Sequence, residues 1–301
     1  MEAVFQMMDE QIRGSFLFDE PMSKHTSWRA GGNAKQFFVA KDIDDLSMML
    51  KSLPEDEEVF WLGLGSNTLV RDGGYQGVVI AMQGVSTGLS IKDETITVGA
   101  SVTCAKLAKY CAKNKLKGAE FFAGIPGLMG GAIAMNAGAF GDETWNHVVD
   151  VETIDRKGEI KKRSADEFAV NYRTVKGYQG EWFVSATLCF EKSATVDESS
   201  TGIKELLAKR AQSQPIGMHS CGSVFKNPEG FYAAELIEGC GLKGKRIGGA
   251  VISEKHANFI LNDKGATAED IESLIILIQR SVSEKYNVDL HTEVKIIGEH
   301  K

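Results

Sequence analysis

Proline is scarce in this chain of 301 residues, which has 5 prolines against 32 glycines. The glycines follow no three-residue period, so a collagen-like or proline-rich low-complexity protein is excluded. Hydrophobic residues make up 43% and charged residues 25% of the sequence, values that are ordinary for a folded protein and give no case for disorder. A chain of this length has room for two or three cores, so we expect several domains, with a ligand cleft plausible between them.

Paired cysteines are also missing. The five cysteines are odd in number, widely separated, and contain no CxxC pair, which argues against a disulfide framework and against a zinc site. We therefore expect no metal, and we interpret the thiols as reduced and buried. They are Cys104, Cys111, Cys189, Cys221 and Cys240.

Positive charge is not in excess, because the formal net charge of the chain is −7. A nucleic acid or an anionic membrane needs a broad basic face, so neither is expected as a partner. An anionic substrate would have to be bound by a local cluster of basic residues. Residues 1–14 lack the basic-then-apolar pattern of a secretion signal, so we expect a cytoplasmic protein without membrane insertion.

The segment GAEFFAGIPGLMGGAIAMNAGAFGD, residues 118–142, has no charged residue between Glu120 and Asp142. An uncharged run of this length suggests a membrane span. However, six glycines lie in it together with Pro126 and Asn136. Each interior glycine costs a helix about 1 kcal/mol and an interior proline about 3 kcal/mol. We therefore predict loops and turns, with one short and tightly packed helix.

Strands dominate the prediction for the first two thirds of the chain. Apolar runs bounded by glycine predict buried strands, and alternating polar and apolar residues predict hairpins. The strands and hairpins are expected at 59–64, 78–82, 89–100, 148–164 and 182–191, with a long loop at 65–77. A surface helix is predicted from Thr103, where apolar residues recur at helical spacing.

Helices dominate the prediction for the last third. Small polar residues at 193–202 predict a linker, and we place a domain boundary there. The long helix is opened by Thr267 as N-cap. The helices are expected at 203–212, 231–241 and 267–286, and the strands near 248–253 and at 288–298.

The run WLGLGSN couples a predicted strand to a glycine-rich turn. Its glycines permit positive φ and let backbone N–H groups point at one anion, while Ser66 and Asn67 add donors. A Rossmann dinucleotide fingerprint would need a third glycine where this chain has Thr68. An ordinary tight turn remains the alternative for this run alone. Together with the glycine-rich segment at 118–142, it favours a site for a large dinucleotide cofactor.

Motifs along nearly the whole chain resemble one known family. In order, they are HTSWRAGG (25–32), GLGSN (63–67), GIPGLMGGAIAMNAGAFG (124–141), NYR (171–173), GSVFKNP (222–228), AAELIEGCGLKG (233–244), SEKHANFILN (253–262) and LHTEVKIIG (290–298). The family is the flavin-dependent UDP-N-acetylenolpyruvoylglucosamine reductases, also called UDP-N-acetylmuramate dehydrogenases. No long insertion with a tyrosine-bearing loop precedes Ser193, so the chain resembles the shorter class of that family.

The resemblance implies an α+β fold. It implies a two-subdomain FAD-binding region of the vanillyl-alcohol-oxidase/PCMH type, followed by an α+β substrate-binding domain. We place FAD-binding subdomain 1 at 1–85, FAD-binding subdomain 2 at 86–195, and the substrate-binding domain at 196–301. The C-terminal strand is expected to return to the active-site cleft.

The resemblance also implies an FAD-dependent NADPH oxidoreductase. Its reaction reduces UDP-N-acetylglucosamine enolpyruvate to UDP-N-acetylmuramate, in cytoplasmic peptidoglycan synthesis for cell-wall biogenesis, cell shape and cell division. The expected cofactors are FAD and NADPH, and the expected state is a monomer or weak oligomer. The residues that the family's pattern assigns to the flavin are Gly63, Leu64, Gly65, Ser66, Asn67, Thr68, Gly124, Ile125, Pro126, Gly127, Gly130, Gly131, Ala132, Asn136 and Gly138.

Three residues match the family's catalytic positions. Arg173 corresponds to the arginine that stabilises the enolate, although an arginine beside a tyrosine is usually a surface residue. Ser223 corresponds to the proton donor, with a turn serine as the alternative. Glu293 corresponds to a glutamate beside that arginine, whereas strand alternation alone places it in solvent.

Basic residues are the candidates for substrate binding. Arg210 and Lys226 are assigned to diphosphate and carboxylate capture, with Asn227 beside them. A cluster at 243–246 is an equal candidate for a merely solubilising role. His256 is expected to be structural rather than a general base.

Two other functions remain open at the level of sequence. The chain could be another flavoenzyme on the same scaffold, such as an oxidase or dehydrogenase of a small alcohol or acid. It could also be a non-catalytic protein that binds a flavin or a nucleotide sugar, which would bind without turnover. The alternative flavoenzyme would keep the glycine-rich loops but would not need GSVFKNP and the terminal LHTEV together.

Overall fold

The computed structural model describes residues 12–193 and 195–301, and it mixes helices and strands as an α+β fold does. Most of residues 1–14, on which the missing secretion signal was judged, lie outside the described part. The chain forms two compact units. The first combines residues up to Leu17 with Phe38–Gly63 and Val79–Ala208, and the second combines Phe18–Phe37, Leu64–Val78 and Lys209–Lys301. The three-part division at 85 and 195 stays a prediction.

A five-stranded antiparallel sheet organises the first unit. Its order is β12 (Ile160–Ser164), β11 (Val148–Asp155), β15 (Glu181–Cys189), β7 (Thr95–Gly99) and β6 (Leu89–Lys92). Both predicted hairpins are therefore confirmed, and the strand predicted at 182–191 forms the middle of the sheet as β15.

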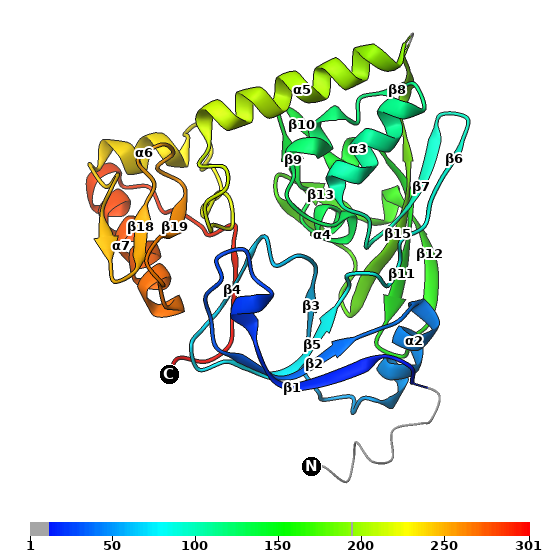
Figure 1. Ribbon diagram of the computed structural model, residues 1–301, viewed down its shortest axis with the longest axis horizontal. Coiled ribbons are helices and arrows are strands. Elements are labelled where there is room, and N and C mark those ends of the chain that lie inside the picture. The colour runs from blue at the N-terminus through cyan, green and yellow to red at the C-terminus, as the bar shows by residue number, and fades with distance from the viewer. Residues whose placement is uncertain (1–11, 194) are drawn as a thin grey trace. The chain divides into compact units, whose positions relative to one another are not determined.

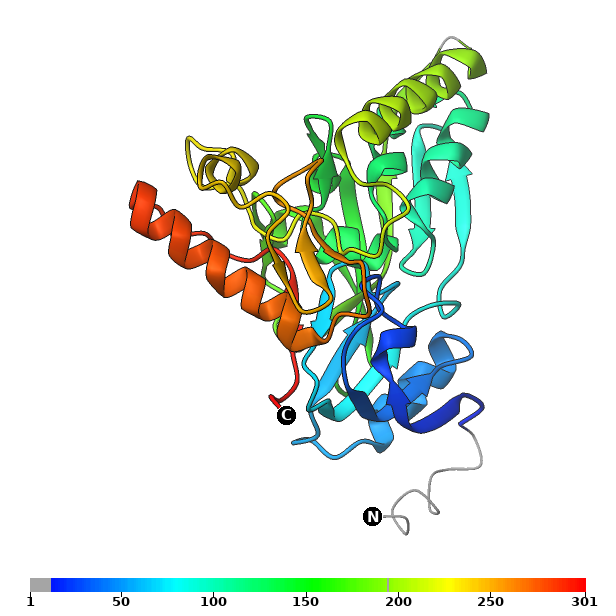
Figure 2. The ribbon, with the colours of Figure 1, turned by 60° about the vertical axis from the view of Figure 1, so that its left-hand side comes forward.

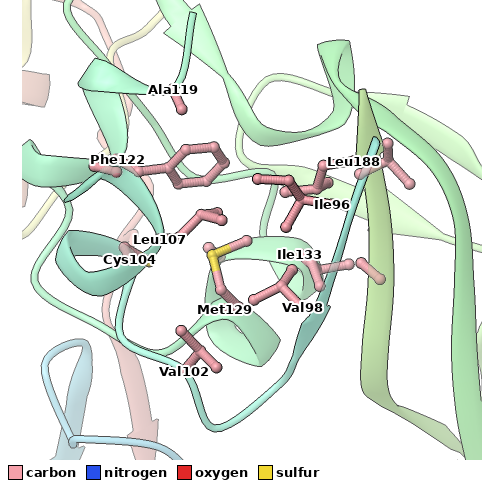
Figure 3. Close-up of a cluster of buried hydrophobic side chains, with 14 of the residues drawn as sticks. Ile96, Val98, Val102, Cys104, Leu107, Ala119, Phe122, Met129, Ile133 and Leu188 are labelled. Carbon is pink, nitrogen blue, oxygen red and sulfur yellow. The ribbon is translucent and has the colours of Figure 1, made fainter. Parts of the chain in front are cut away.

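Two helices share a buried core with this sheet (Figure 1). Helix α3 (Cys104–Lys113) begins where predicted, because the side chain of Thr103 accepts a hydrogen bond from the Lys106 amide at 3.2 Å. Helix α4 (Met129–Ala134) is the short helix predicted inside the glycine-rich segment. Figure 3 shows Met129 beside Leu107 of α3, and these side chains belong to one buried core.

The remaining elements before residue 193 fall in the residue ranges of both units. A four-stranded sheet has the order β1 (Ser15–Pro21), β2 (Asn33–Val39), β5 (Tyr75–Ala81) and β3 (Val59–Leu62). The other elements before residue 193 are η1 (Met22–Lys24), α2 (Ile43–Ser52), β8 (Leu116–Lys117), η2 (Glu120–Gly124), β9 (Gly138–Ala139), β10 (Asp142–Glu143), η3 (Thr144–Asn146), η4 (Ala165–Glu167), β13 (Ala169–Asn171), β14 (Thr174–Lys176) and β16 (Glu191–Lys192).

The predicted linker at 193–202 is wrong from Val196 onward. Helix α5 (Val196–Ser213) begins there and continues as one helix through the segment predicted as helical (Figure 1). Small polar residues form a helix here because one of them is anchored: Ser199 is buried and its hydroxyl donates to the Leu116 carbonyl at 3.1 Å. The buried side chain of Ile203 joins the first unit's core.

The second unit is built on a three-stranded antiparallel sheet. Its order is β17 (Arg246–Ile247), β18 (Ala250–Ile252) and β19 (Ile260–Asn262). Helix α7 (Ala268–Tyr286) packs across this sheet (Figure 2), and α6 (Ala233–Gly239) packs on α7. Thr267 caps α7 as predicted, in a capping box with Asp270.

The predicted loop at 65–77 contains a strand that the sequence did not indicate. Strand β4 (Thr68–Val70) is fully buried and pairs in parallel with β20 (Lys295–Ile297). The predicted terminal strand at 288–298 is correspondingly shorter, because only its end finds a continuous partner. Before it, pairing is reduced to an isolated bridge between Phe225 and Thr292.

The residues after β4 attach this strand to α7. Arg71 makes a two-pronged ion pair with Glu272, with N–O distances of 3.0 and 2.8 Å, and this contact raises the pKa of Arg71. The Asp72 carboxylate accepts from the amides of Ala268 and Glu269 at 3.1 and 2.9 Å. A carboxylate at a helix N-terminus is stabilising, so the start of α7 is fixed to the segment that follows the GLGSN turn.

Across residues 12–193 and 195–301, none of the helices combines the length and the apolar character that crossing a bilayer requires. Within the same ranges, no group of three or more histidine, cysteine or acidic side chains is arranged to hold a metal ion.

All five thiols are free, and three of them are buried as expected. Burial raises the pKa of Cys104, Cys111 and Cys221 to about 12. The expectation is wrong for Cys189, which is exposed, and for Cys240, which is half-buried. Cys189 ends β15, and its side chain alternates away from the core there.

We predict that iodoacetamide at mildly alkaline pH alkylates Cys189 first, and Cys104, Cys111 and Cys221 only after unfolding. The thiolate is the reactive form, and a thiol with a pKa near 12 stays protonated under these conditions. Peptide mass spectrometry of timed samples measures the order. Equal labelling of all sites in denaturant is the control, and rapid labelling of Cys104 in the folded protein would contradict the prediction.

Candidate functional site

The GLGSN turn has one position that only glycine can occupy. Gly65 has φ of +60°, and a Cβ there would overlap the carbonyl oxygen of His25. Its own carbonyl accepts from the Ser27 amide at 3.0 Å. The predicted flavin-binding residues Leu64, Gly65, Ser66, Asn67 and Thr68 all lie in the second unit, whereas Gly63 ends a segment of the first.

Asn67 connects this turn to the end of the chain. Its side-chain amide donates to the Glu293 carbonyl at 3.1 Å, and its own carbonyl accepts from the Lys295 amide at 3.0 Å. The Cys221 thiol lies 3.5 Å from the carbonyls of both Gly65 and Thr68. The turn is thus held against both the terminal segment and the segment that leads to Ser223.

The segments that contain Ser223 and Glu293 are joined by a backbone hydrogen bond at Val224. The Val224 carbonyl, next to Ser223, accepts from the Glu293 amide at 2.8 Å. Two residues after Val224, the Lys226 amide donates to the His291 carbonyl at 2.9 Å. Glu293 is half-buried, while its neighbours His291 and Lys295 are exposed. Alternation therefore holds for those neighbours but not for the glutamate that the family pattern singled out.

Sequence reasoning missed Asn258, which anchors the Ser223 loop. Its side chain accepts from the Phe225 amide at 2.9 Å and donates to the Phe225 carbonyl at 2.8 Å. Its carbonyl accepts from the Val224 amide at 2.9 Å. The available signal was a single asparagine between apolar residues in HANF, since a buried amide must find partners.

The predicted substrate-binding residues also lie in the second unit. Asn227 is exposed, and its side-chain oxygen accepts from the Ala233 amide at 3.0 Å, at the start of α6. Arg210, in the last turn of α5, donates to the Gln214 side chain at 2.9 Å. Burial lowers the pKa of Arg210. Among the described residues no carboxylate forms an ion pair with it, so a half-buried cation lacks an anionic partner in the protein.

Two residues of the basic cluster at 243–246, and His256, make contacts within the protein. Lys243 pairs with Glu238 at 3.1 Å, and Arg246 pairs with Asp263. His256 accepts a hydrogen bond from the Asn258 amide on Nδ1 at 3.3 Å, and burial lowers its pKa. A neutral histidine with one ring nitrogen committed to the backbone fits the structural role that was expected for it.

The glycine-rich segment folds back on the core of the first unit. The amides of Met129 and Gly130 open α4 by donating to the carbonyls of Val102 and Ala100, each at 2.9 Å. A Cβ on Gly130 would lie 3.0 Å from that of Ala100, so this glycine permits close packing. The other predicted flavin-binding residues of the first unit are Gly124, Ile125, Pro126, Gly127, Gly131, Ala132, Asn136 and Gly138.

Arg173 lies at the tip of the hairpin formed by β13 and β14. The residue is in the left-handed region, with φ of +52°, and its guanidinium donates to the carbonyls of Asn136 and Gly138 at 3.2 and 2.8 Å. It also lies over the Tyr172 ring at 5.2 Å. Arg173 is thereby fixed to the glycine-rich segment, in the first unit.

Asn136 is itself committed to holding that segment. It is 1% exposed. Its side-chain oxygen accepts from the Trp145 amide at 3.0 Å, and its nitrogen donates to Glu143 at 2.8 Å and to the Asn171 carbonyl at 3.3 Å. A direct contact between this side chain and a cofactor stays a prediction. The side-chain contacts of Asn136 fix the segment whose carbonyls, at Asn136 and Gly138, accept hydrogen bonds from Arg173.

One glycine of the segment has no packing reason among residues 12–193 and 195–301. Gly131 lies inside α4 and is exposed, and a Cβ built on it would meet no atom of those residues within 4 Å. Glycine in a helix costs about 1 kcal/mol relative to alanine, so packing alone would favour alanine. Bare backbone at this point fits a large ligand that approaches closely, as a flavin dinucleotide would.

Two family models match the chain. The model described as "FAD binding domain" matches residues 34–164, and the model described as "UDP-N-acetylenolpyruvoylglucosamine reductase, C-terminal domain" matches residues 214–297. The first match contains the GLGSN turn and the glycine-rich segment. The second contains Ser223 and Glu293. The chain therefore carries an FAD-binding domain.

Curated relatives match over almost their full length. The UDP-N-acetylenolpyruvoylglucosamine reductase of Legionella pneumophila (strain Corby) is 52% identical, over 96% of this chain and 94% of its own. That of Coxiella burnetii (strain Dugway 5J108-111) is 48% identical, over 96% and 97%. The solved structure of the UDP-N-acetylenolpyruvylglucosamine reductase from Thermus caldophilus is 30% identical, with a TM-score of 0.81 over 94% of this chain and 98% of that one.

These matches confirm the resemblance drawn from the motifs, together with the α+β fold and its FAD-binding region. The glycine turns, the Ser223 segment and the terminal Glu293 segment all lie within the matched lengths. The chain belongs to the UDP-N-acetylenolpyruvoylglucosamine reductase family, whose members are FAD-binding oxidoreductases.

Proposed function

We propose that this protein reduces UDP-N-acetylglucosamine enolpyruvate to UDP-N-acetylmuramate in the cytoplasm, with FAD as cofactor and NADPH as reductant. The observation that carries the proposal is the joint anchoring of Ser223 and Glu293. The Val224 carbonyl and the Asn67 side chain hold the backbone of Glu293 from two directions. These contacts support the proposal, because they link the segments of Ser223 and Glu293 to the GLGSN turn.

Bound FAD supplies hydride transfer from NADPH to the enolpyruvyl double bond. The protein has two further tasks, because a hydride added to this alkene places negative charge on the adjoining carboxylate and leaves one carbon to be protonated. Arg173 is assigned to stabilising this negative charge. Hydrogen bonds to the carbonyls of Asn136 and Gly138 orient its fork of donors without neutralising it.

Ser223 is assigned to donating the proton to this carbon. A hydroxyl is a weak acid in water, so its transfer to carbon depends on a fixed position and a suitable neighbour. Asn258 holds the following two residues by side chain and backbone, which limits the movement of the serine. Lys226 is three residues away in sequence and is assigned to tuning the hydroxyl or binding phosphate. Glu293 is assigned to orienting the substrate or assisting the enolate.

Arg210, Lys226 and Asn227 are assigned to anion capture. A half-buried arginine whose pKa is lowered by burial gains most from an anionic ligand, and a diphosphate or a carboxylate provides one. The side-chain oxygen of Asn227 accepts a hydrogen bond from the Ala233 amide at the start of α6. This bond fixes the orientation of the side-chain amide nitrogen, which is assigned to the anion. The flavin is assigned to the GLGSN turn and to the glycine-rich segment at 118–142. Within that segment, Gly131 on α4 leaves the backbone open to a ligand.

We predict that Ser223→Ala leaves reduction of the flavin by NADPH intact and slows flavin reoxidation by the enolpyruvyl substrate by about 10²-fold or more. Only the second half of the reaction needs the proton. Stopped-flow absorbance measures the two half-reactions separately. Equal losses in both halves would refute the assignment of the serine.

We predict that Arg210→Ala and Lys226→Ala each weaken substrate binding by roughly ten- to hundredfold, the effect of losing a hydrogen bond to a charged group. Calorimetric titration with the substrate measures the dissociation constant. Lys209→Ala is the matched control, because Lys209 is exposed on the same helix. Unchanged binding in both variants would remove these residues from the anion site.

We predict that Gly131→Ala lowers flavin affinity by at least about tenfold and raises the stability of the flavin-free protein by up to about 1 kcal/mol. The methyl group favours the helix and fills the space assigned to the cofactor. Gly202→Ala in α5 is the control, because a Cβ there meets only the Glu120 side chain at 3.4 Å. Flavin retention on dialysis and denaturant unfolding measure the two effects. Undiminished flavin retention would contradict the assignment of Gly131.

A further inference from the structure

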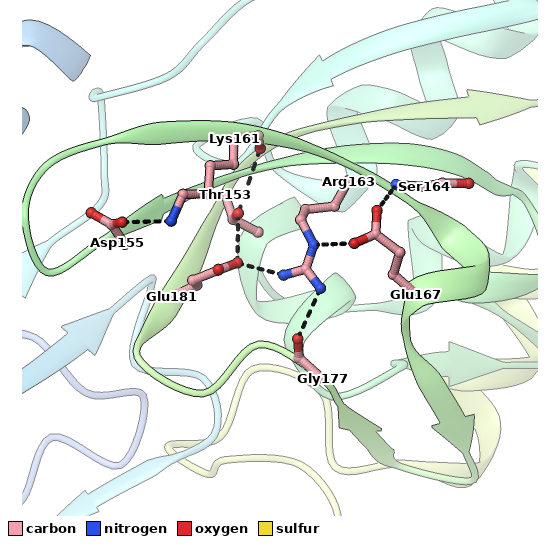
Figure 4. Close-up of polar contacts among 8 residues, drawn as sticks. All are labelled: Thr153, Asp155, Lys161, Arg163, Ser164, Glu167, Gly177 and Glu181. Atoms are coloured by element: carbon pink, nitrogen blue, oxygen red, sulfur yellow. Dashed lines mark hydrogen bonds and ion pairs between the residues drawn. The ribbon is translucent and has the colours of Figure 1, made fainter.

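A polar cluster around Arg163 lies outside the residues assigned to the reaction (Figure 4). Arg163 is on β12, and its guanidinium donates to Glu167 at 2.7 Å, to Glu181 at 2.7 Å and to the Gly177 carbonyl at 3.2 Å. It also lies over the Phe168 ring at 4.8 Å. One side chain therefore contacts four separate groups.

Two of these groups mark the base of the hairpin that carries Arg173. Phe168 directly precedes β13, and Gly177 directly follows β14. The strands pair from Ala169 with Lys176 to Asn171 with Thr174, so Arg173 lies in the turn between them. Arg163 thus binds both ends of the segment whose tip is assigned to the enolate.

The other two groups fix Arg163 to the sheet. Glu181 begins β15, and the oxygen that accepts from Arg163 also accepts from the hydroxyl of Thr153 on β11 at 2.8 Å. The side chains of Arg163 and Glu181 are 18% and 16% exposed, so water screens this pair only partly. Glu167 is held in turn by a capping box with Ser164.

The opposite end of the hairpin is held by the glycine-rich segment. Asn136 donates to the Asn171 carbonyl, and Arg173 donates to the carbonyls of Asn136 and Gly138. These contacts constrain the tip only if the base is fixed, because a two-stranded hairpin is marginally stable by itself. The buried side chains of Phe168 and Val175 hold the base in the core, and the Arg163 fork adds polar contacts whose geometry lysine cannot reproduce.

We propose that Arg163 is a positioning residue for Arg173 and thereby sets the rate at which the enolpyruvyl substrate reacts. The proposal rests on the proposed function, in which Arg173 stabilises charge on the substrate. Arg163 itself touches the hairpin base, Glu167 and Glu181. Its effect is therefore expected on the half-reaction that needs Arg173 and not on reduction of the flavin by NADPH.

The test compares Arg163→Met and Arg163→Lys with Lys161→Met. Lys161 lies on the same strand and pairs with Asp155 at 2.8 Å, away from the hairpin base (Figure 4). Its replacement by methionine removes the same charge from the same strand. We expect both Arg163 variants to slow flavin reoxidation by the enolpyruvyl substrate roughly ten- to hundredfold, as small misplacements of a catalytic group do. We expect unchanged reduction by NADPH, and both half-reactions unchanged in Lys161→Met.

Hydrogen exchange of the flavin-free protein supplies a readout that does not depend on turnover. Amides of residues 169–176 should exchange faster in Arg163→Met and Arg163→Lys than in the parent chain and in Lys161→Met. Amides of β11 serve as the internal reference. A general loss of stability would raise exchange in both places, and that outcome would overturn a specific role for Arg163.

A double-mutant cycle with Arg173→Ala separates this inference from the proposed function. If Arg163 acts through Arg173, adding Arg163→Met to Arg173→Ala changes the enolpyruvyl half-reaction by less than about twofold. A slow Arg173→Ala with a normal Arg163→Met overturns the positioning role alone. A normal Arg173→Ala overturns the role of Arg173 in the proposed function and the inference with it. Multiplied losses in the double variant show that Arg163 acts elsewhere, which also overturns it.

Discussion

The backbone of the terminal segment depends on two hydrogen bonds that arrive from distant parts of the sequence. The Val224 carbonyl and the Asn67 amide group hold the main chain of Glu293, and the pairing of β4 with β20 continues this attachment. Backbone atoms are the anchored groups in these contacts, so the contacts fix where Glu293 lies along the terminal segment. Fixing catalytic groups by rigid secondary contacts is what positions them within the tolerance that a reaction needs.

Regular elements of the fold were predictable from local patterns. The two hairpins of the large sheet follow from alternation, and α7 follows from its capping residues and apolar face. Local rules failed at β4, whose three residues are too few to show a period and whose partner lies at the other end of the chain. They failed again at α5, where Ser199 replaces an apolar anchor by a hydrogen bond to Leu116.

Local sequence patterns likewise predicted some features of the candidate site and missed others. Glycine turns marked the cofactor-binding region because open backbone has few other uses, and Gly131 illustrates this in a helix that would otherwise favour alanine. The catalytic assignments came from the family pattern, since an arginine, a serine and a glutamate at such spacings carry no local signal. Asn258 and Arg163 were missed because their roles depend on neighbours that no spacing reveals.

The discontinuity of the second unit has a consequence for synthesis of the protein. Its GLGSN turn is made early, whereas β20 and the Glu293 segment follow only after the whole of the first unit. Chains are made from the N-terminus, and compact parts fold as their residues become available. The first unit can therefore assemble while translation continues, but β4, which follows the GLGSN turn, cannot pair with β20 until residues 295–297 have been made.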